Sequence, residues 1–176
     1  MNATLETDPY YDKFIKELAL NLSTTKFTNG SKSHALSILR TTFNVAKNHV
    51  YILSKELDNE TYSDSVLIRN AKDFLIKQDA HLKVFVQSDD NGISNQDFCK
   101  NLKDAPNVDI FFAKDKKIKE LPLNFMVADG HMYRLEPNSS KHEAIGCFND
   151  KVIATELEGI FSRLENINLD SRESRT

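Results

Sequence analysis

The segment HVYILS, residues 49–54, decides the fold class of this chain. It is short, apolar and rich in β-branched and aromatic residues, which is typical of a strand buried on both faces. Residues 35–46 and 66–75, on either side of it, carry apolar side chains at helical spacing, and HLKVFV at 81–86 repeats the strand pattern. This order of helix, strand, helix, strand predicts helices packed over a parallel or mixed sheet.

The second half of the chain extends this sheet. Residues 108–113, VDIFFA, form a third expected strand, and residues 123–128 and 132–135 flank an Asp-Gly pair at 129–130. Because Asp-Gly is typical of hairpin turns, these two runs predict an antiparallel pair. A last amphipathic helix carries apolar residues from 152 to 164. We therefore predict an α/β fold with a mixed, mostly parallel sheet flanked by helices.

Another amphipathic helix is expected near the N-terminus, over residues 8–22. Asp8 suits the N-cap position of this helix, and Pro9 suits its first helical position. A turn signal follows it, which marks a boundary, and the polar C-terminus is expected to fray. We expect three parts: an N-terminal helical arm at 1–30, an α/β domain at 31–167 and a flexible tail at 168–176.

Composition limits the classes of function. The 176 residues are 40% hydrophobic, enough for one substantial core, and the formal net charge of -3 gives no global positive field. The two cysteines, Cys99 and Cys147, lack metal-ligand spacing and do not suggest a disulfide scaffold. Neither a signal peptide nor a membrane-spanning run is evident. We expect a cytoplasmic protein without membrane contact.

Two motifs and the order of elements over residues 34–164 resemble half of a phospholipase D superfamily enzyme. In that family one strand carries His, any residue, Lys, four residues and Asp, and a later strand carries Gly-Ser-any-Asn. Here residues 129–130 match the Asp-Gly, Pro122 stands in place of the nucleophilic His, and Asn124 in place of the Lys. The later motif reads GCFN at 146–149, with Cys for Ser. The resemblance implies a phospholipase D-like half-domain with an added N-terminal helix.

The missing His and Lys decide the functional prediction. The family's His attacks phosphorus and its Lys steadies charge on the phosphoryl oxygens, and neither Pro122 nor Asn124 can do this. We expect a degenerate, non-catalytic bacterial module that binds a protein partner or an anionic, phosphate-bearing ligand, as a homodimer or a regulatory subunit. The alternative is a phosphodiesterase or nuclease with a rearranged site at the dimer interface, using His131 with Asp129.

Four residues are the expected ligand-binding set: Asp129, His131, Arg134 and Asn149. Arg can grip a phosphate with two parallel hydrogen bonds, and Asn can donate another. Three of them have a simpler reading, because Asp129 suits a turn, His131 suits an exposed position, and Arg134 can pair with Glu136. Separately, the 54–56 segment (Ser-Lys-Glu) ends the first strand, where open α/β sheets place ligands.

Other candidates are weaker. His142 and Glu143, with His131, offer the ingredients of a metal site but no recognisable spacing, so we expect no metal and no cofactor. Cys147 is either a thiol nucleophile or, more simply, a buried core residue. The three remaining histidines are expected to be structural: His34, His49 and His81.

A lysine-rich stretch follows the third strand. Its four lysines, with Phe111 and Phe112 just before them, could contact nucleic acid through phosphates and base stacking. Adjacent aromatic residues on a central strand point to opposite faces, however, and both would then be core. A solvated loop is the simpler interpretation. The lysines are Lys114, Lys116, Lys117 and Lys119.

Overall fold

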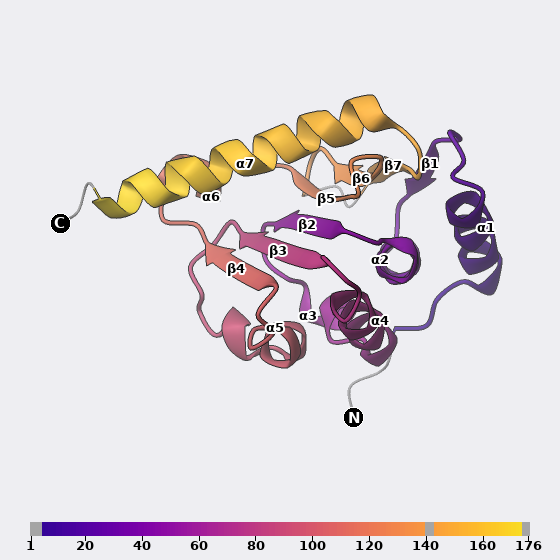
Figure 1. Cartoon of the computed structure of the whole chain (residues 1–176), viewed down its shortest axis with the longest axis horizontal. Coiled ribbons are helices and arrows are strands. Elements are labelled where there is room, and N and C mark those ends of the chain that lie inside the picture. Colours follow the sequence, from indigo (N-terminus) through magenta and orange to yellow (C-terminus); the bar gives the residue numbers. More distant parts are fainter. Residues whose placement is uncertain (1–4, 140–142, 174–176) are drawn as a thin grey trace.

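A seven-stranded sheet forms the centre of the molecule. The computed structural model describes residues 5–139 and 143–173, with side chains through 170. The strand order is β1-β7-β6-β5-β2-β3-β4 (Figure 1). The strands are β1 (Phe27–Asn29), β2 (His49–Ser54), β3 (His81–Val86), β4 (Val108–Phe112), β5 (Asn124–Ala128), β6 (Met132–Glu136) and β7 (Ala144–Cys147).

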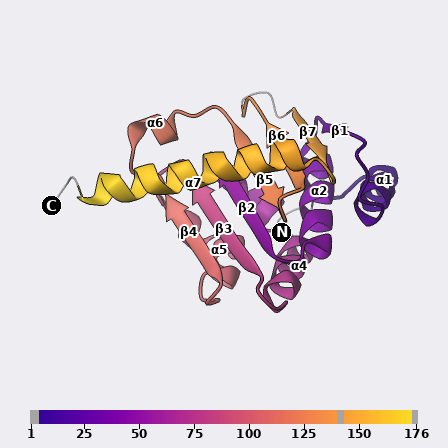
Figure 2. The same ribbon diagram turned by 45° about the horizontal axis from the view of Figure 1, so that its top comes forward.

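Helices cover both faces of this sheet. The long helix α7 lies across the strands on one face, and α2, α4 and α5 lie on the other (Figures 1 and 2). Each face has its own hydrophobic core, one under α7 and one under α2, α4 and α5. The helices are α1 (Pro9–Leu20), α2 (Lys32–Val45), α3 (Asn59–Tyr62), α4 (Ser65–Leu75), the 3₁₀ turn η1 (Ile93–Asn95), α5 (Asp97–Leu102), α6 (Lys116–Lys119) and α7 (Lys151–Glu173).

The predicted mixed α/β sheet flanked by helices is confirmed. The prediction that most strand pairs are parallel is corrected, because most of them are antiparallel. Strand β3 pairs in parallel with β2 and β4, whereas the other four pairs are antiparallel. For two of these four pairs, β5–β6 and β6–β7, the reason is connection length. Residues 129–131 join β5 to β6 and residues 137–143 join β6 to β7. A parallel crossover needs a dozen residues or more, so these short connections permit only antiparallel neighbours.

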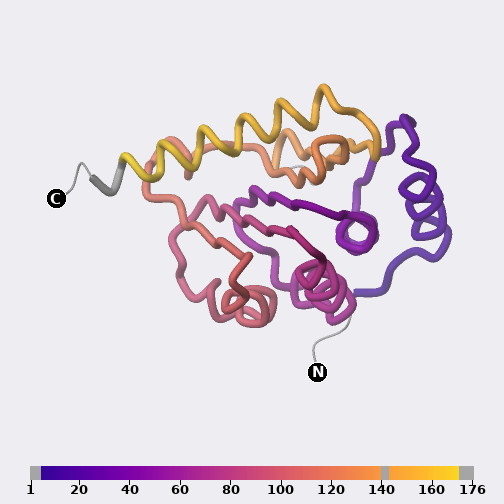
Figure 3. The backbone as a smooth tube through the Cα atoms, viewed as in Figure 1, coloured from indigo at the N-terminus to yellow at the C-terminus, as the bar shows by residue number. Residues whose placement is uncertain are grey.

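The N-terminal segment packs into the main core. Strand β1 pairs with β7, and in Figure 3 the indigo segment lies beside the orange strands. On α1, Ile15 and Ala19 are buried in the core shared with α2. The Tyr11 ring stacks on the His34 ring at a centroid distance of 3.7 Å, and its hydroxyl donates to the Thr28 carbonyl oxygen at 2.8 Å. Residues 9–29 therefore do not form a separate arm.

Helix boundaries follow their polar caps. Asp8 accepts a hydrogen bond from the Tyr10 N–H at 2.9 Å, as the sequence predicts, and Ser31 caps α2. Sequence patterns missed β1, α3 and α6, because three or four residues are too short for a periodic signal. At the other end, α7 continues through Glu173, so residues 168–173 of the expected tail are helical. Residues 174–176 lie outside the described residues.

Candidate functional site

A pocket of about 320 Å³ opens at the carboxyl end of β2. Its walls come from the first turns of α2, the residues that follow β2, helix α3, the start of β5 and strand β6. Ser54, Lys55 and Glu56 line it, so the pocket lies where the position of these residues after the first strand predicted a ligand site. The carboxyl ends of strands are the usual place for ligands in open α/β sheets.

An oppositely charged pair occupies the less accessible part of the pocket. Arg134 and Glu136 alternate along β6, and their side chains are only 12% and 7% exposed. The Arg134 Nε donates to Asn29 Oδ1 at 2.9 Å, while Nη1 and Nη2 donate to Glu136 Oε2 at 3.4 and 3.3 Å. Bonds between such charged groups are usually 2.7–2.9 Å long. The guanidinium is thus held firmly by Asn29 and loosely by Glu136.

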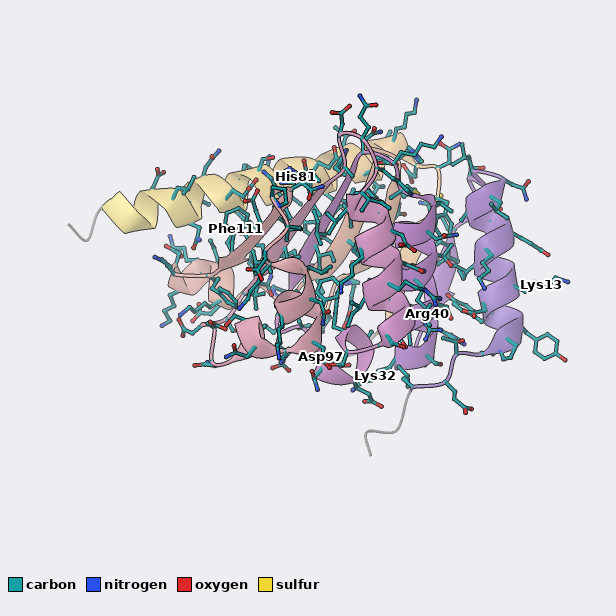
Figure 4. All side chains as sticks on the ribbon, turned by 60° about the horizontal axis from the view of Figure 1, so that its bottom comes forward. Lys13, Lys32, Arg40, His81, Asp97 and Phe111 are labelled. Carbon is teal, nitrogen blue, oxygen red and sulfur yellow. The ribbon has the colours of Figure 1, made fainter. Side chains whose placement is uncertain are left out.

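A second pair lies at the more exposed side of the pocket. The Lys32 Nζ is 3.1 Å from Asp58 Oδ1 and 2.7 Å from Glu60 Oε2, and Figure 4 labels Lys32. The hydrogen bonds that Lys32 donates to Glu60 and then to Asp58 raise the pKa of Lys32. Burial acts to raise the pKa of Asp58, but hydrogen bonds from Thr61 and Lys32 outweigh it and lower that pKa. Both groups of the pair are therefore charged at neutral pH.

Neutral polar groups complete the lining. Asn124 Oδ1 accepts a hydrogen bond from the Lys55 N–H at 2.8 Å, and Ser54 Oγ donates to the Glu56 carbonyl oxygen at 2.6 Å. Burial raises the pKa of Tyr62, so its phenol stays neutral and can both donate and accept. Residues of this kind bind polar ligands by hydrogen bonds.

The described part of the lining carries both signs of charge. Among the residues that the structure describes, three cationic side chains and three carboxylates line the pocket. Two of the carboxylates face a cation directly, as described above, and the third is adjacent to Lys55 in sequence. The six residues are Lys32, Lys55, Arg134, Glu56, Asp58 and Glu136.

The four residues predicted from sequence to bind a ligand do not converge. Arg134 lines the pocket, but Asp129 follows the last residue of β5, whereas Asn124 at the pocket is its first. Five extended residues span roughly 16 Å. The length of β5 therefore separates Asp129 from the pocket.

Asp129 joins two elements at the opposite end of the sheet. Its carboxylate accepts hydrogen bonds from the backbone N–H groups of Lys47, Asn48 and His49 at 2.7, 2.8 and 3.0 Å. Its φ of 52° and the φ of 67° at Gly130 give the hairpin turn that the Asp-Gly pair predicts. Asp129 thus fastens the β5–β6 turn to the start of β2.

His131 and Asn149 lie at the same end as Asp129. The His131 Nδ1 is 2.9 Å from the Phe148 carbonyl oxygen, which joins the hairpin to the segment after β7. Asn149 is partly buried and precedes Asp150, whose Oδ1 accepts from the Ile153 N–H at 3.2 Å and caps α7. The hydrogen bonds at this end hold backbone segments together.

A contact between a histidine and a glutamate near this turn was not predicted from the sequence. His49 Nε2 is 2.5 Å from Glu158 Oε1, which also accepts a hydrogen bond from the Gly130 N–H at 3.0 Å. His49 and Glu158 are far apart in the sequence, so no local motif could have indicated their contact. The contact joins β2, the hairpin and α7.

Both positions that the resemblance assigns to catalytic residues hold backbone contacts. The Pro122 carbonyl oxygen accepts from the Ser139 N–H at 2.7 Å, and Asn124 holds the Lys55 backbone. Asn124 and Ser139 both line the pocket. The pocket therefore adjoins the two positions that the sequence resemblance assigns to the family's His and Lys.

The cysteines are core residues. Cys147 is 1% exposed within the core under α7, and its Sγ lies 3.5 Å from the Ser23 carbonyl oxygen. Burial raises the pKa of Cys99 to about 11. Within residues 5–139 and 143–173, no three His, Cys, Asp or Glu side chains are placed to hold a metal ion. His142 lies outside the described residues.

The lysine-rich stretch forms the short helix α6 with mixed charge around it. Lys119 Nζ is 2.7 Å from Asp89 Oδ1, and Lys116 pairs with Glu120 at 3.6 Å. Phe112 packs against the core under α2, and Phe111, labelled in Figure 4, against the core under α7. Both rings are partly buried and pack on opposite faces of the sheet, as their alternation on the strand predicts.

Comparison with known proteins yields a likeness of fold. No family model matches the sequence, and no curated protein matches it. Among solved structures, TrmBL2, an archaeal chromatin protein reported with a novel mode of DNA binding, matches with a TM-score of 0.57 and 8% identity. The match covers 89% of this chain and 59% of that one. At this identity the likeness concerns the fold alone. In the described part of the chain, every helix is too short or too polar to cross a membrane.

Proposed function

We propose that this chain is a degenerate phospholipase D-like module that binds a small polar ligand through an anionic group, without catalysing its conversion. The observation that carries the proposal is the pocket at the carboxyl end of β2, with the Arg134 guanidinium in its wall. Arg134 presents donors in a planar fork that matches phosphate and carboxylate oxygens. Lys55 supplies a second cation at the same pocket.

The loose contact with Glu136 supports Arg134 as the anion-binding residue. Guanidinium carries five N–H groups, and the bonds to Asn29 and Glu136 involve three of them. The anchor at Nε fixes the plane of the fork, so a ligand would meet a preorganised group. The first turn of α2, at Ser31 and Lys32, also lines the pocket, and helix N-termini favour anions.

The composition of the pocket supports a binding role over a catalytic one. Among the described residues of its lining there is neither His nor Cys, which are common nucleophiles in phosphoryl transfer. The hydroxyl of Ser31 accepts a hydrogen bond from the His34 N–H at 3.2 Å, as a helix cap does.

Calorimetric titration tests the proposal with inorganic phosphate and ethyl phosphate as probes. We expect saturable binding by the wild type and binding weaker by about tenfold or more in Arg134→Gln, because a charged hydrogen bond is lost. Lys55→Gln, at an exposed position, should weaken binding without affecting folding. Arg69→Gln on the exposed face of α4 is the matched control and should bind as the wild type does. Binding that is absent, or unchanged in Arg134→Gln and Lys55→Gln, contradicts the proposal.

The phosphodiesterase alternative requires His131 and Asp129 to act on a substrate. Their hydrogen bonds to backbone groups favour a structural role instead. We expect no hydrolysis of bis(p-nitrophenyl) phosphate, DNA or RNA above buffer. Hydrolysis by the wild type that disappears in a folded His131→Ala variant would restore the alternative.

Nucleic acid, a protein partner and a homodimer remain further predictions. The DNA binding named for TrmBL2 suggests a nucleic-acid partner, but the net charge of -3 and the paired lysines of α6 do not favour one. An electrophoretic mobility shift assay at two salt concentrations tests whether the chain binds nucleic acid. Light scattering coupled to size exclusion tests the homodimer.

A further inference from the structure

We infer that the outer edge of β4 is a homodimer interface, where the β4 strands of two copies pair antiparallel and join the two sheets into one. The inference rests on the backbone groups along this edge and on the apolar side chains between them. It does not depend on the ligand pocket, because the described residues of the pocket lining include none from β4.

Strand β4 is the open edge of the sheet. It is last in the strand order and outermost on its side in Figure 2. The opposite edge, β1, has only three residues, and its Thr28 carbonyl oxygen accepts a hydrogen bond from Tyr11 of α1. Strand β4 has five residues without Lys or Pro, and its one charged side chain, Asp109, is 2.9 Å from the His81 ring. It thus lacks the features that usually keep edge strands from pairing.

Hydrogen bonds to β3 show which backbone groups of β4 face outward. The Ala113 N–H donates to the Val86 carbonyl oxygen at 2.8 Å, so the backbone groups of every second residue before position 113 face β3. The backbone groups of the intervening residues face away from β3. These residues are Val108, Ile110 and Phe112.

The outward groups are complementary to those of a second copy. The Val108 N–H donates to the Ala105 carbonyl oxygen at 3.2 Å, and the Phe112 carbonyl oxygen accepts from Asn168 Nδ2 at 3.3 Å. The other four groups make no hydrogen bond to any described residue: the Val108 C=O, the Ile110 N–H and C=O, and the Phe112 N–H. A two-fold axis at Ile110 pairs all four, because the two Ile110 residues bond each other and each Val108 C=O accepts from the partner's Phe112 N–H.

The side chains along this edge also suit a second copy. Val108, Ile110 and Phe112 are partly buried on one face of the sheet. Pairing about the axis sets Ile110 beside its own copy and Val108 beside the partner's Phe112, and such apolar cross-strand pairs are stabilising. On the other face, α7 continues past β4 in Figures 1 and 2, where Ile167 and Leu169 are 45% and 48% exposed. The axis keeps both α7 helices on this face, so their ends add apolar surface near the contact.

Size exclusion coupled to light scattering, over a series of protein concentrations, tests the dimer. We expect the wild type to reach the mass of two 20.1 kDa chains. Ile110→Lys should raise the dissociation constant at least about tenfold, because two like charges then meet at the axis. Thr28→Lys, at an exposed position on the β1 edge, is the matched control and should dimerise as the wild type does.

Hydrogen exchange on the wild type tests the same contact without a variant. The amides of Ile110 and Phe112 should exchange more slowly as concentration raises the dimer fraction. The amides of Asp109 and Phe111, which face β3, should stay protected at every concentration.

Three results would each overturn the inference. They are a wild type that stays monomeric throughout the series, a dimer that is unchanged in Ile110→Lys, and exchange at Ile110 and Phe112 that does not depend on concentration. None of them bears on the proposed anion-binding function, which its own titration decides.

Discussion

At the scale of single residues, two aspartates make contacts between segments that are distant in the sequence. Asp129 accepts three backbone N–H groups at the start of β2, and Asp64 caps α4 by accepting from the Leu67 N–H at 2.7 Å. Asp64 also binds Arg40, labelled in Figure 4, through two hydrogen bonds of 2.8 and 2.6 Å. Each carboxylate therefore stabilises the fold through contacts that no sequence motif indicates.

Replacement of Asp129 by Ala is expected to lower the free energy of unfolding by about 2 kcal/mol, because three N–H groups lose their acceptor. Ala also tolerates the φ of 52° poorly. Urea denaturation followed by circular dichroism measures the loss. Asp79→Ala, at another position of positive φ, is the control for the backbone effect. Similar small losses in both variants would refute the role of the three N–H contacts.

Asp64→Asn is expected to destabilise the protein by about 3 kcal/mol at pH 7, because Arg40 loses a nearly buried partner while Asn still caps α4. Burial acts to raise the pKa of Asp64, but bonds from Arg40 and Leu67 outweigh it, so the pKa lies below 3.8. Because the pKa of Asp64 is lower in the folded than in the unfolded protein, its carboxylate stabilises the folded state at pH values above the unfolded-state pKa. This stabilisation is lost as the pH falls through the folded-state pKa.

The difference between wild type and Asp64→Asn should therefore be full at pH 6 and shrink as pH falls below about 4. Urea titrations at a series of pH values measure it. A difference that is constant across this range would refute the ion pair as its source.

At the scale of elements, the N-terminal segment is joined to the sheet by close packing. Gly146 on β7 faces Phe27 on β1, and a Cβ at position 146 would overlap the Phe27 ring and lie 2.6 Å from the Tyr133 carbonyl oxygen. The glycine of the second family motif is thus explained by contact between two strands. Helix α1 is joined in the same way, through Ile15 and Ala19.

Gly146→Ala should lower the free energy of unfolding by about 2 kcal/mol, because the added methyl group displaces Phe27. The double variant with Phe27→Leu should recover part of this loss. Gly30→Ala, where a Cβ would meet nothing within 4 Å, is the matched control. Thermal and urea unfolding measure these effects, and a loss shared equally by both alanine variants would contradict the packing argument.

Ile15→Ala is expected to cost about 3 kcal/mol, because the fully buried side chain leaves a cavity between α1 and α2. Leu20→Ala on the same helix, at a position 75% exposed, should change stability by less than about 0.5 kcal/mol. Urea denaturation compares the two. Equal, small effects would mean that α1 is attached only weakly.

At the scale of the whole molecule, the sheet connects the two cores. Within β2 alone, Ile52 belongs to the core under α2 and Leu53 to the core under α7. Strand β5 likewise contributes Met126 to one and Phe125 to the other. Loss of the sheet removes a wall from both cores, so neither is expected to persist without the other.

Unfolding should therefore be a single cooperative transition. Far-UV circular dichroism and the near-UV signal of the tyrosines, which lie on α1, β2, α3 and β6, should give coincident midpoints in urea. A separate early transition, removed by deletion of residues 1–22, would instead identify α1 as an independent unit.

The sequence by itself determined the alternation of helices and strands, the cap at Asp8, and the Asp-Gly turn. These features depend on patterns within a few residues, so composition and period are sufficient to read them. The carboxyl end of β2 could also be predicted as a ligand position, because strand direction sets it.

Only the tertiary structure decided the balance of parallel and antiparallel pairs, the place of β1 and the lining of the pocket. Arg134 and Asn29 are far apart in sequence, and so are Lys32 and Asp58, yet each pair is in contact. Such convergence depends on how strands pair and how α2 packs over them, which no local pattern encodes. For the same reason Arg134 lies in the pocket, while Asp129, which was predicted to bind the same ligand, fastens the other end of the sheet.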